Sequence, residues 1–244
     1  MLRILVFLTV FLSIGFCGTT ESQTSSFETK TEFNELENNT GGEIESRFKP
    51  PTGYSRKTES ETTFAYYLRH LPLKPPGTKV KYYDGRIKQK DVYEAVVNMD
   101  IGKKDLQQCA DAVMRLRGEY LFAQKKYKEI EFNLTNGFKL DYNKWASGNR
   151  VRVNGNITSW YKASEASNTY GDFRKYMDFV FIYGGTLSLS KSLKTINLTE
   201  IAIGDVFIQG GSPGHAVIVV DIAENQNGQK AFMLAQSYMP AQDI

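Results

Sequence analysis

The sequence predicts an α+β protein in which an antiparallel sheet packs against helices, and three observations lead to this prediction. A strong amphipathic helix pattern begins near Asp105, in DLQQCADAVMRLRGEYLFAQKKY. A nearly continuous apolar run, AVIVVDI, follows His215 and is typical of a strand that is buried on both faces. The run KAFMLAQ comes after the turn signal Asn227-Gly228 and fits an antiparallel neighbour of that strand.

The composition is that of an ordinary globular protein. The chain has 244 residues, of which 41% are hydrophobic and 23% charged, so one domain with extensions is expected. The formal net charge is only +3, which gives no field strong enough to indicate a nucleic-acid partner. Partners must therefore be inferred from candidate sites.

The N-terminal segment 1–17 predicts a bacterial-type export signal. Leu2 to Phe16 form an apolar run that is too short for a comfortable membrane span, and Cys17 follows it directly. A lipidated cysteine stands in this position in lipoproteins; simple cleavage of the signal is the alternative. Both predict an exported protein, in the periplasm or at the outer membrane, and only the lipidated form has a membrane contact, through its N-terminal anchor.

The remainder divides into a tether and a folded part. Residues 18–61 are rich in Ser, Thr, Glu, Asn and Gly, a composition that predicts a disordered polar tether. Residues 62–244 are expected to form a single α+β domain. Because SYMPAQD before Ile244 shows no tapering of composition, we expect the natural chain to continue past this residue.

Several local signals predict individual elements. Asp105 is expected to cap the first helix, with Gln108 three residues later as in a capping box. A second helix is expected from near Asp172 to Tyr183, before two glycines. The dipeptides Asp84-Gly85 and Asn154-Gly155 predict two hairpins.

Histidine is scarce, and this excludes some classes of site. The chain holds only His70 and His215, with no CxxC, HExxH or Walker pattern, so neither a metal nor a cofactor is expected. His70 precedes a Pro-rich turn and is interpreted as a surface or packing residue. His215 opens the buried strand after the turn GGSPG, which is a suitable place for a general base. The alternative is a histidine that caps the strand by hydrogen bonds.

Cys109 is the second cysteine of the chain and the candidate nucleophile. A helical side chain leans toward the N-terminus of its helix, so the thiol is expected near the first turn, where free N–H groups favour the thiolate. The alternative is packing, because Cys109 lies on the apolar face with Val113 and Leu116, and free cysteine is among the most buried residue types.

A polar residue on the next strand would orient the imidazole of His215. With Asn227-Gly228 as a tight turn, the connecting loop has an even length, and strand alternation puts Gln236 and Tyr238 on the face of His215. Gln236 is favoured, although such a turn brings Tyr238 or even Pro240 nearer. An odd loop would put Ser237 there instead.

The order of these features resembles the papain-like cell-wall hydrolases of the NlpC and CHAP types. The features are a helix that carries Cys109, the dipeptide GD, the dipeptide GH opening an apolar strand, and a polar residue on the next strand. The resemblance implies a papain-like core, Cys109 as nucleophile, His215 as base and Gln236 as the orienting residue. In those families the cysteine stands at the very start of its helix and nearer to the histidine in sequence.

From about Tyr82 to its end, the chain also resembles an exported bacterial family defined only as a domain of unknown function (DUF4846). The segments that carry this resemblance are DLQQCADAVMRLRGEYL, KWASGNRV, GHAVIVVDIA and FMLAQSYMPAQDI. The resemblance implies no established activity, and it implies further chain beyond Ile244.

Two functions are compatible with these patterns. The first is a thiol hydrolase that acts on amide bonds of a peptide or peptidoglycan-type substrate in the cell envelope. The second is a non-catalytic envelope lipoprotein or binding module on the same scaffold. In that case Trp145 and Arg150, with Trp160 and Tyr161, would offer a stacking platform for carbohydrate or peptide, and Tyr238 is a further candidate binding residue. The rival interpretation of these aromatics is core packing.

Overall fold

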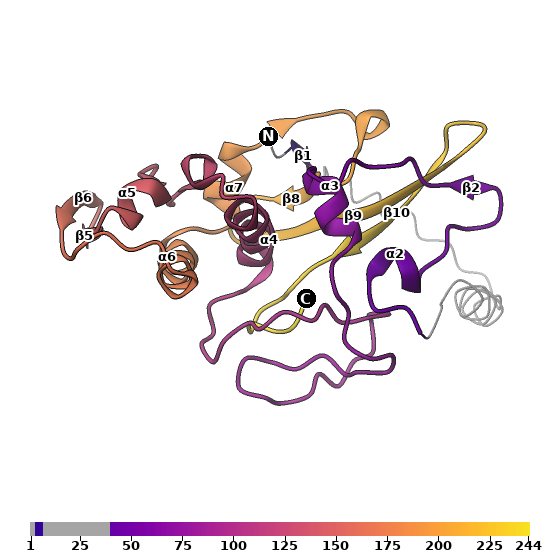
Figure 1. Cartoon of the computed structure of the whole chain (residues 1–244), viewed down its shortest axis with the longest axis horizontal. Helices are drawn as coiled ribbons and strands as arrows, with labels where there is room; N and C mark the ends of the chain where they lie inside the picture. The colour runs from indigo at the N-terminus through magenta and orange to yellow at the C-terminus, as the bar shows by residue number, and fades with distance from the viewer. Residues whose placement is uncertain (1–2, 7–39) are drawn as a thin grey trace, which may run out of the picture.

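The computed structural model describes residues 3–6 and 40–244 of the chain (Figure 1). Cys17 and most of the predicted signal lie outside the described residues. The exception is Arg3–Val6, which forms the strand β1. None of the helices in the described part is long and apolar enough to cross a membrane.

A central sheet organises the α+β fold. Its strands lie in the order β10-β9-β8-β1-β7, and β2 pairs with the far end of β9. The strands β8, β9 and β10 are antiparallel, which confirms the predicted antiparallel pair, whereas β1 runs parallel to β8 and β7. The strands of this sheet are β1 Arg3–Val6, β2 Tyr54–Ser55, β7 Lys194–Thr195, β8 Val206–Gln209, β9 His215–Asn225 and β10 Lys230–Ala235.

Helices cover one face of this sheet, and a smaller α+β extension continues to one side (Figure 1). The central helix α4 packs on β9, α3 lies beside it, and α6 packs against α4. Two hairpins, β3–β4 and β5–β6, belong to the extension. These elements are α2 Ile44–Arg47, α3 Phe64–Arg69, α4 Cys109–Ala123, β3 Glu131–Asn133, β4 Lys139–Asp141, α5 Tyr142–Ala146, β5 Asn149–Asn154, β6 Ile157–Lys162, α6 Tyr170–Tyr183 and α7 Thr186–Ser192, with short 3-10 helices at Tyr127–Glu129 and Leu198–Glu200.

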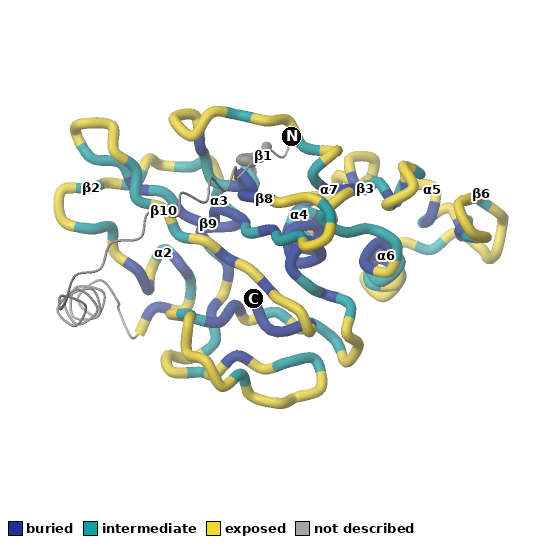
Figure 2. Tube along the Cα trace, turned by 180° about the vertical axis from the view of Figure 1, so that it is seen from behind, coloured by how far each residue is buried: buried dark blue, intermediate teal, exposed yellow. Residues whose placement is uncertain are grey.

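The main core lies between the helices and the sheet, and Figure 2 shows the buried residues gathered in α4 and the strands beside it. Val113 and Leu116 of α4 are fully buried there against Ile218 of β9. Each such side chain contributes about 1.5–3 kcal/mol through its burial. The opposite face of the sheet carries only a small cluster around Phe207 and Val219, so it is the more open face.

One boundary and the form of one hairpin differ from those predicted. The folded part begins by residue 40 rather than at 62, because Ile44 and Phe48 are buried in the main core. The residues around Ile44 and Phe48 are mostly polar, so the composition of this segment does not indicate that it is folded. The turn predicted at Asp84-Gly85 is present, with Gly85 at φ +87° and an antiparallel bridge between Lys81 and Ile87, but its two arms do not form regular strands. Tyr82 bridges Gln242 on the other side, so this short hairpin is held against the last residues of the described chain.

Candidate active site

The helix α4 begins at Cys109, three residues later than predicted. Gln108 is its N-cap, and the Gln108 N–H donates to the Asp111 Oδ2 at 3.0 Å. The Asp105 carboxylate, which was the expected cap, instead accepts the N–H of Ala241 at 2.6 Å. A capping box fits both Asp105 with Gln108 and Gln108 with Asp111, and the helix uses the second pair. Cys109 therefore occupies the first helical position, where backbone N–H groups have no partner within the helix.

The thiol of Cys109 lies against the strand that carries His215. The N–H of Ala216, the residue next to His215, points toward the thiol, as do those of Ala110 and Cys109 itself. Burial is the largest influence and raises the pKa of the thiol, the three N–H groups oppose it, and Asp111 adds to the rise. The prediction that the helix terminus lowers this pKa is thus wrong in its net direction, because Cys109 is only 7% exposed.

The position of the thiol follows from the hydrogen-bonding pattern of β9. Val219 exchanges both of its backbone hydrogen bonds, of 2.8 and 2.9 Å, with the turn before β8. Because successive residues alternate, Ala216 directs its N–H to the other edge, toward β10. The last residue of β10, Ala235, pairs with Ile218, so no β10 residue faces Ala216. The Cys109 thiol lies at this end of β10 and approaches that N–H.

His215 and Gln236 are joined directly. The His215 Nε2 lies 2.6 Å from the Gln236 Oε1, which can only accept. This bond places the proton of a neutral imidazole on Nε2 and leaves the lone pair on Nδ1, as a general base requires. Tyr238 packs edge-on against the His215 ring, with a centroid distance of 5.2 Å, and stays 52% exposed.

The sequence argument placed Gln236 on the face of His215 for an incorrect reason. The Asn225 N–H donates to the Gln229 carbonyl at 3.0 Å, so three residues, 226–228, form the loop rather than two. An odd loop alone would bring Ser237 to that face. The register shifts by one residue between Met233 and Leu234, where the pairing passes over Val220, and this β-bulge restores Gln236.

Ser237 holds the start of α4 to the strand that carries Gln236. Its side chain is fully buried, and its Oγ lies 2.9 Å from the Gln107 carbonyl oxygen and 2.7 Å from that of Gln242. This contact and the bond of Asp105 to Ala241 join residues 105–107 to residues 237–242. They fix Cys109 relative to His215 and Gln236. Sequence reasoning missed this role because a lone Ser carries no motif.

Trp145 and Arg150 lie far from this cluster and do not form an exposed platform. Trp145 is 5% exposed and packs against Tyr176 at 5.7 Å between ring centroids, while Arg150 covers its ring at 4.3 Å. The expectation of a stacking surface there is wrong for Trp145, because a buried indole presents no face to a ligand. His70 hydrogen-bonds the Tyr66 carbonyl at 2.8 Å, as a packing residue does.

The described part of the chain contains no group of three His, Cys, Asp or Glu side chains that would hold a metal ion. At the start of α4 the Cys109 thiol lies against the backbone of β9 at Ala216, and the neighbouring His215 is bonded through its imidazole to the Gln236 amide. This places the three candidate residues at one end of β9, in an α+β protein with a candidate cysteine and histidine site.

The comparison with protein families agrees with one expectation from the sequence. Residues 44–244 match the family model described as a domain of unknown function (4846), so the chain belongs to this family. The comparison with curated proteins found no match, and neither did the comparison with solved structures.

Proposed function

We propose that the protein is an exported thiol hydrolase that cleaves amide bonds of peptides in the cell envelope. Cys109 is the nucleophile, His215 the general base and Gln236 the residue that orients the imidazole. One observation supports this proposal most: the Cys109 thiol meets the Ala216 N–H at the first turn of α4, beside a histidine whose Nε2 is bonded to Gln236. The start of α4 at Cys109 also removes a departure from the papain-like NlpC and CHAP pattern.

The raised thiol pKa decides the order of the proton transfers. A protonated resting thiol gives up its proton to the Nδ1 of His215 as the sulfur attacks the substrate carbonyl. The tetrahedral intermediate then collapses, the C–N bond breaks, and the imidazolium returns the proton to the leaving amine. A water molecule, deprotonated by the same Nδ1, attacks the thioester and releases the acid and the free thiol.

The first turn of α4 also offers stabilisation of the developing negative charge. The N–H groups of Cys109, Ala110 and Ala216 surround the sulfur, so an oxyanion formed on the adjacent carbon would lie within their reach. Such fixed donors typically contribute about 3–4 kcal/mol to the transition state when they are well placed.

A second candidate function is a non-catalytic binding module of the envelope. The low exposure of Cys109 and its raised pKa favour this alternative, because an inert buried thiol has both properties. The two proposals share the export signal, the candidate lipid anchor at Cys17 and a peptide-like partner.

Hydrolysis of a quenched-fluorescence peptide library separates these proposals. The enzyme is expected to cleave library members, and Cys109→Ser and His215→Ala are each expected to lose at least a hundredfold in rate. His70→Ala is the matched control, since it removes the other histidine, away from the site. The hydrolase is refuted if wild type cleaves no library member, or if His215→Ala and His70→Ala behave alike.

A further inference from the structure

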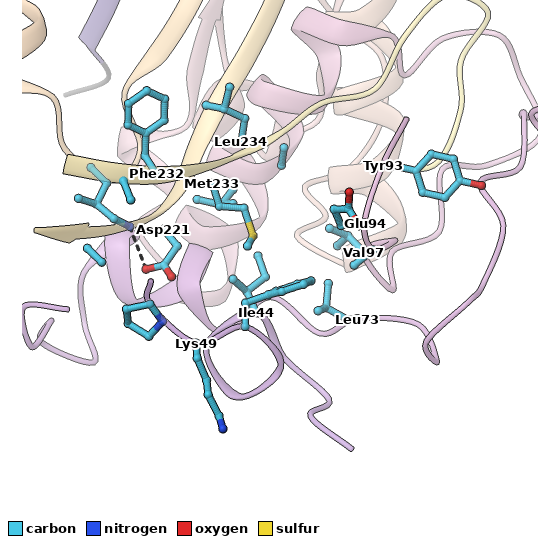
Figure 3. Close-up of a pocket in the computed structure, with 18 of the residues that line it drawn as sticks. Ile44, Lys49, Leu73, Tyr93, Glu94, Val97, Asp221, Phe232, Met233 and Leu234 are labelled. Carbon is cyan, nitrogen blue, oxygen red and sulfur yellow. Dashed lines mark hydrogen bonds between the residues drawn. The ribbon is translucent and has the colours of Figure 1, made fainter. Parts of the chain in front are cut away.

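An apolar pocket of about 400 Å³ begins at Gln236 and follows β10 away from the candidate site. The residues that surround it come from α2, from segment 92–97, and from the paired strands β9 and β10. In Figure 3, Met233 points down from β10 toward Ile44 of α2, whereas Phe232 and Leu234 point to the other side of the strand. Pockets of this size accommodate small ligands or several side chains.

The lining pattern places the pocket along the free edge of β10. All six consecutive residues from Ala231 to Gln236 line it, although alternate side chains of a strand point to opposite faces. Phe232 and Leu234, which point away from the pocket, therefore reach it through their backbone (Figure 3). Segment 92–95 forms the wall across this opening.

The backbone of Leu234 presents a donor and an acceptor at that edge. Leu234 pairs with Val219, and Val219 turns both of its backbone groups toward β8. In such a pair the partner's N–H and C=O point away from β9, to the outer side of the sheet. Neither group of Leu234 has a hydrogen-bond partner within residues 3–6 and 40–244. An unpaired edge of this kind is a template for an added strand.

The two faces of such an added strand would both meet apolar surface. Side chains that point to the α2 side would enter the pocket above Ile44 and Phe48. Side chains on the other side would lie beside Phe232 and Leu234, which are 40% and 45% exposed. Charged residues also line the pocket: Arg56 and Asp221 form an ion pair of 2.6 Å, and the Lys49 side chain extends away from the pocket in Figure 3.

We propose that the free edge of β10 binds an extended, apolar peptide segment as an additional strand, and that this segment is the part of the substrate that enters the pocket. Strand addition supplies main-chain affinity, and the alternate pockets supply specificity. Leu234 lies two residues, about 7 Å, from Gln236, so a peptide paired at Leu234 continues toward His215. This assignment of a substrate class rests on the proposed hydrolase, whereas the binding itself does not require catalysis.

The test uses the inert Cys109→Ala variant and a fluorescein-labelled peptide, Lys-Leu-Val-Ala-Leu-Ala-Lys, in a fluorescence anisotropy titration. Leu234→Pro removes the outward N–H without touching the bonds to β9, a change that edge strands tolerate. Leu234→Ala is the matched control because it keeps the N–H and loses only the side chain. We expect Leu234→Pro to weaken binding about tenfold and Leu234→Ala to weaken it no more than about threefold.

A second measurement tests strand addition without the Leu234→Pro variant, in case that variant fails to fold. An alternately N-methylated form of the same peptide lacks the donors of one edge and is expected to bind the Cys109→Ala chain at least tenfold more weakly. Equal binding of the two peptides, or equal effects of the two Leu234 substitutions, overturns strand addition. Displacement of the peptide by dodecanoate together with indifference to N-methylation overturns it too, in favour of an acyl-chain pocket.

The same reagents distinguish a failure of this inference from a failure of the proposed function. Peptide that binds with the expected pattern but is never cleaved by wild type sustains strand addition and refutes the hydrolase. If wild type and Leu234→Pro cleave the peptide equally well, the hydrolase is sustained and the assigned edge is refuted.

Discussion

Replacing Asp111 by asparagine tests how burial controls ionisation at the start of α4. Asp111 is 7% exposed, its Oδ2 accepts the Gln108 N–H, and its Oδ1 has no partner in the described part of the chain. Burial raises the pKa of this carboxyl from 3.8 to about 7, against the opposing effect of the two backbone N–H groups. The folded protein therefore keeps a proton that the unfolded chain loses near pH 4.

The sign and size of the effect follow from that difference. Between pH 4 and pH 7 the folded state binds more protons at Asp111 than the unfolded state, so stability falls as the pH rises. The difference between a pKa of 3.8 and one of about 7 corresponds to about 4 kcal/mol of stability, which is lost in full above pH 7. An asparagine side chain at this position cannot ionise and keeps one oxygen acceptor, but its buried amide N–H₂ costs about 1–2 kcal/mol if unpaired. The net expectation is that Asp111→Asn stabilises the fold by about 2 kcal/mol at pH 8.

Urea denaturation at pH 4, 6 and 8, followed by tryptophan fluorescence, measures this difference. The variant is expected to be slightly less stable than wild type at pH 4 and more stable at pH 8, with equal m-values. Parallel stability curves of the two proteins across this range would refute the reasoning, since Asp111 would then ionise normally in the folded protein.

The remaining predictions concern the imidazole and the fold. Gln236→Ala removes the acceptor of the His215 Nε2–H and is expected to lower kcat tenfold to a hundredfold, with little loss of stability because Gln236 is exposed. Gln236→Glu keeps an acceptor and should recover activity. Equal kcat values for wild type and Gln236→Ala would contradict the orienting role. Gly148→Ala is expected to lower stability by about 3 kcal/mol or more in thermal melting, since Gly148 has φ +89° and a Cβ there would lie 2.1 Å from a carbonyl oxygen of Ser164. An unchanged melting temperature would contradict this expectation.

The sequence predicted those parts of the fold whose signals are local and strong. The apolar run of β9, its antiparallel neighbour β10 and the end of α6 at Tyr183 were all readable from period and turn chemistry. The burial of Ile44 and Phe48 was not, because two apolar residues in a polar segment give no periodic pattern. Their partners, such as Val97, are far away in sequence.

The candidate site shows the same limit at the level of single residues. His215 was identified from its place at the opening of the buried strand and Gln236 by strand alternation, yet the pairing of the two depends on a β-bulge at Val220 that no local signal marks. The start of α4 was misplaced because two pairs of residues fit a capping box, Asp105 with Gln108 and Gln108 with Asp111. The observed helix uses the second pair, and the Asp105 carboxylate accepts the N–H of Ala241, a tertiary bond that the sequence does not indicate. The thiol pKa likewise depends on burial, which sequence alone does not give.

The cooperation of Cys109 with His215 is tested most directly by the rate of Cys109 alkylation with iodoacetamide as a function of pH. The measurement uses a Cys17→Ala chain, so that only one thiol reacts, and peptide mapping locates the label. With His215 as the base of a buried, protonated thiol, alkylation at pH 7 should fall at least tenfold in His215→Ala and stay unchanged in His70→Ala. Identical rate profiles for wild type and His215→Ala, both rising only above pH 9, would contradict the proposed site.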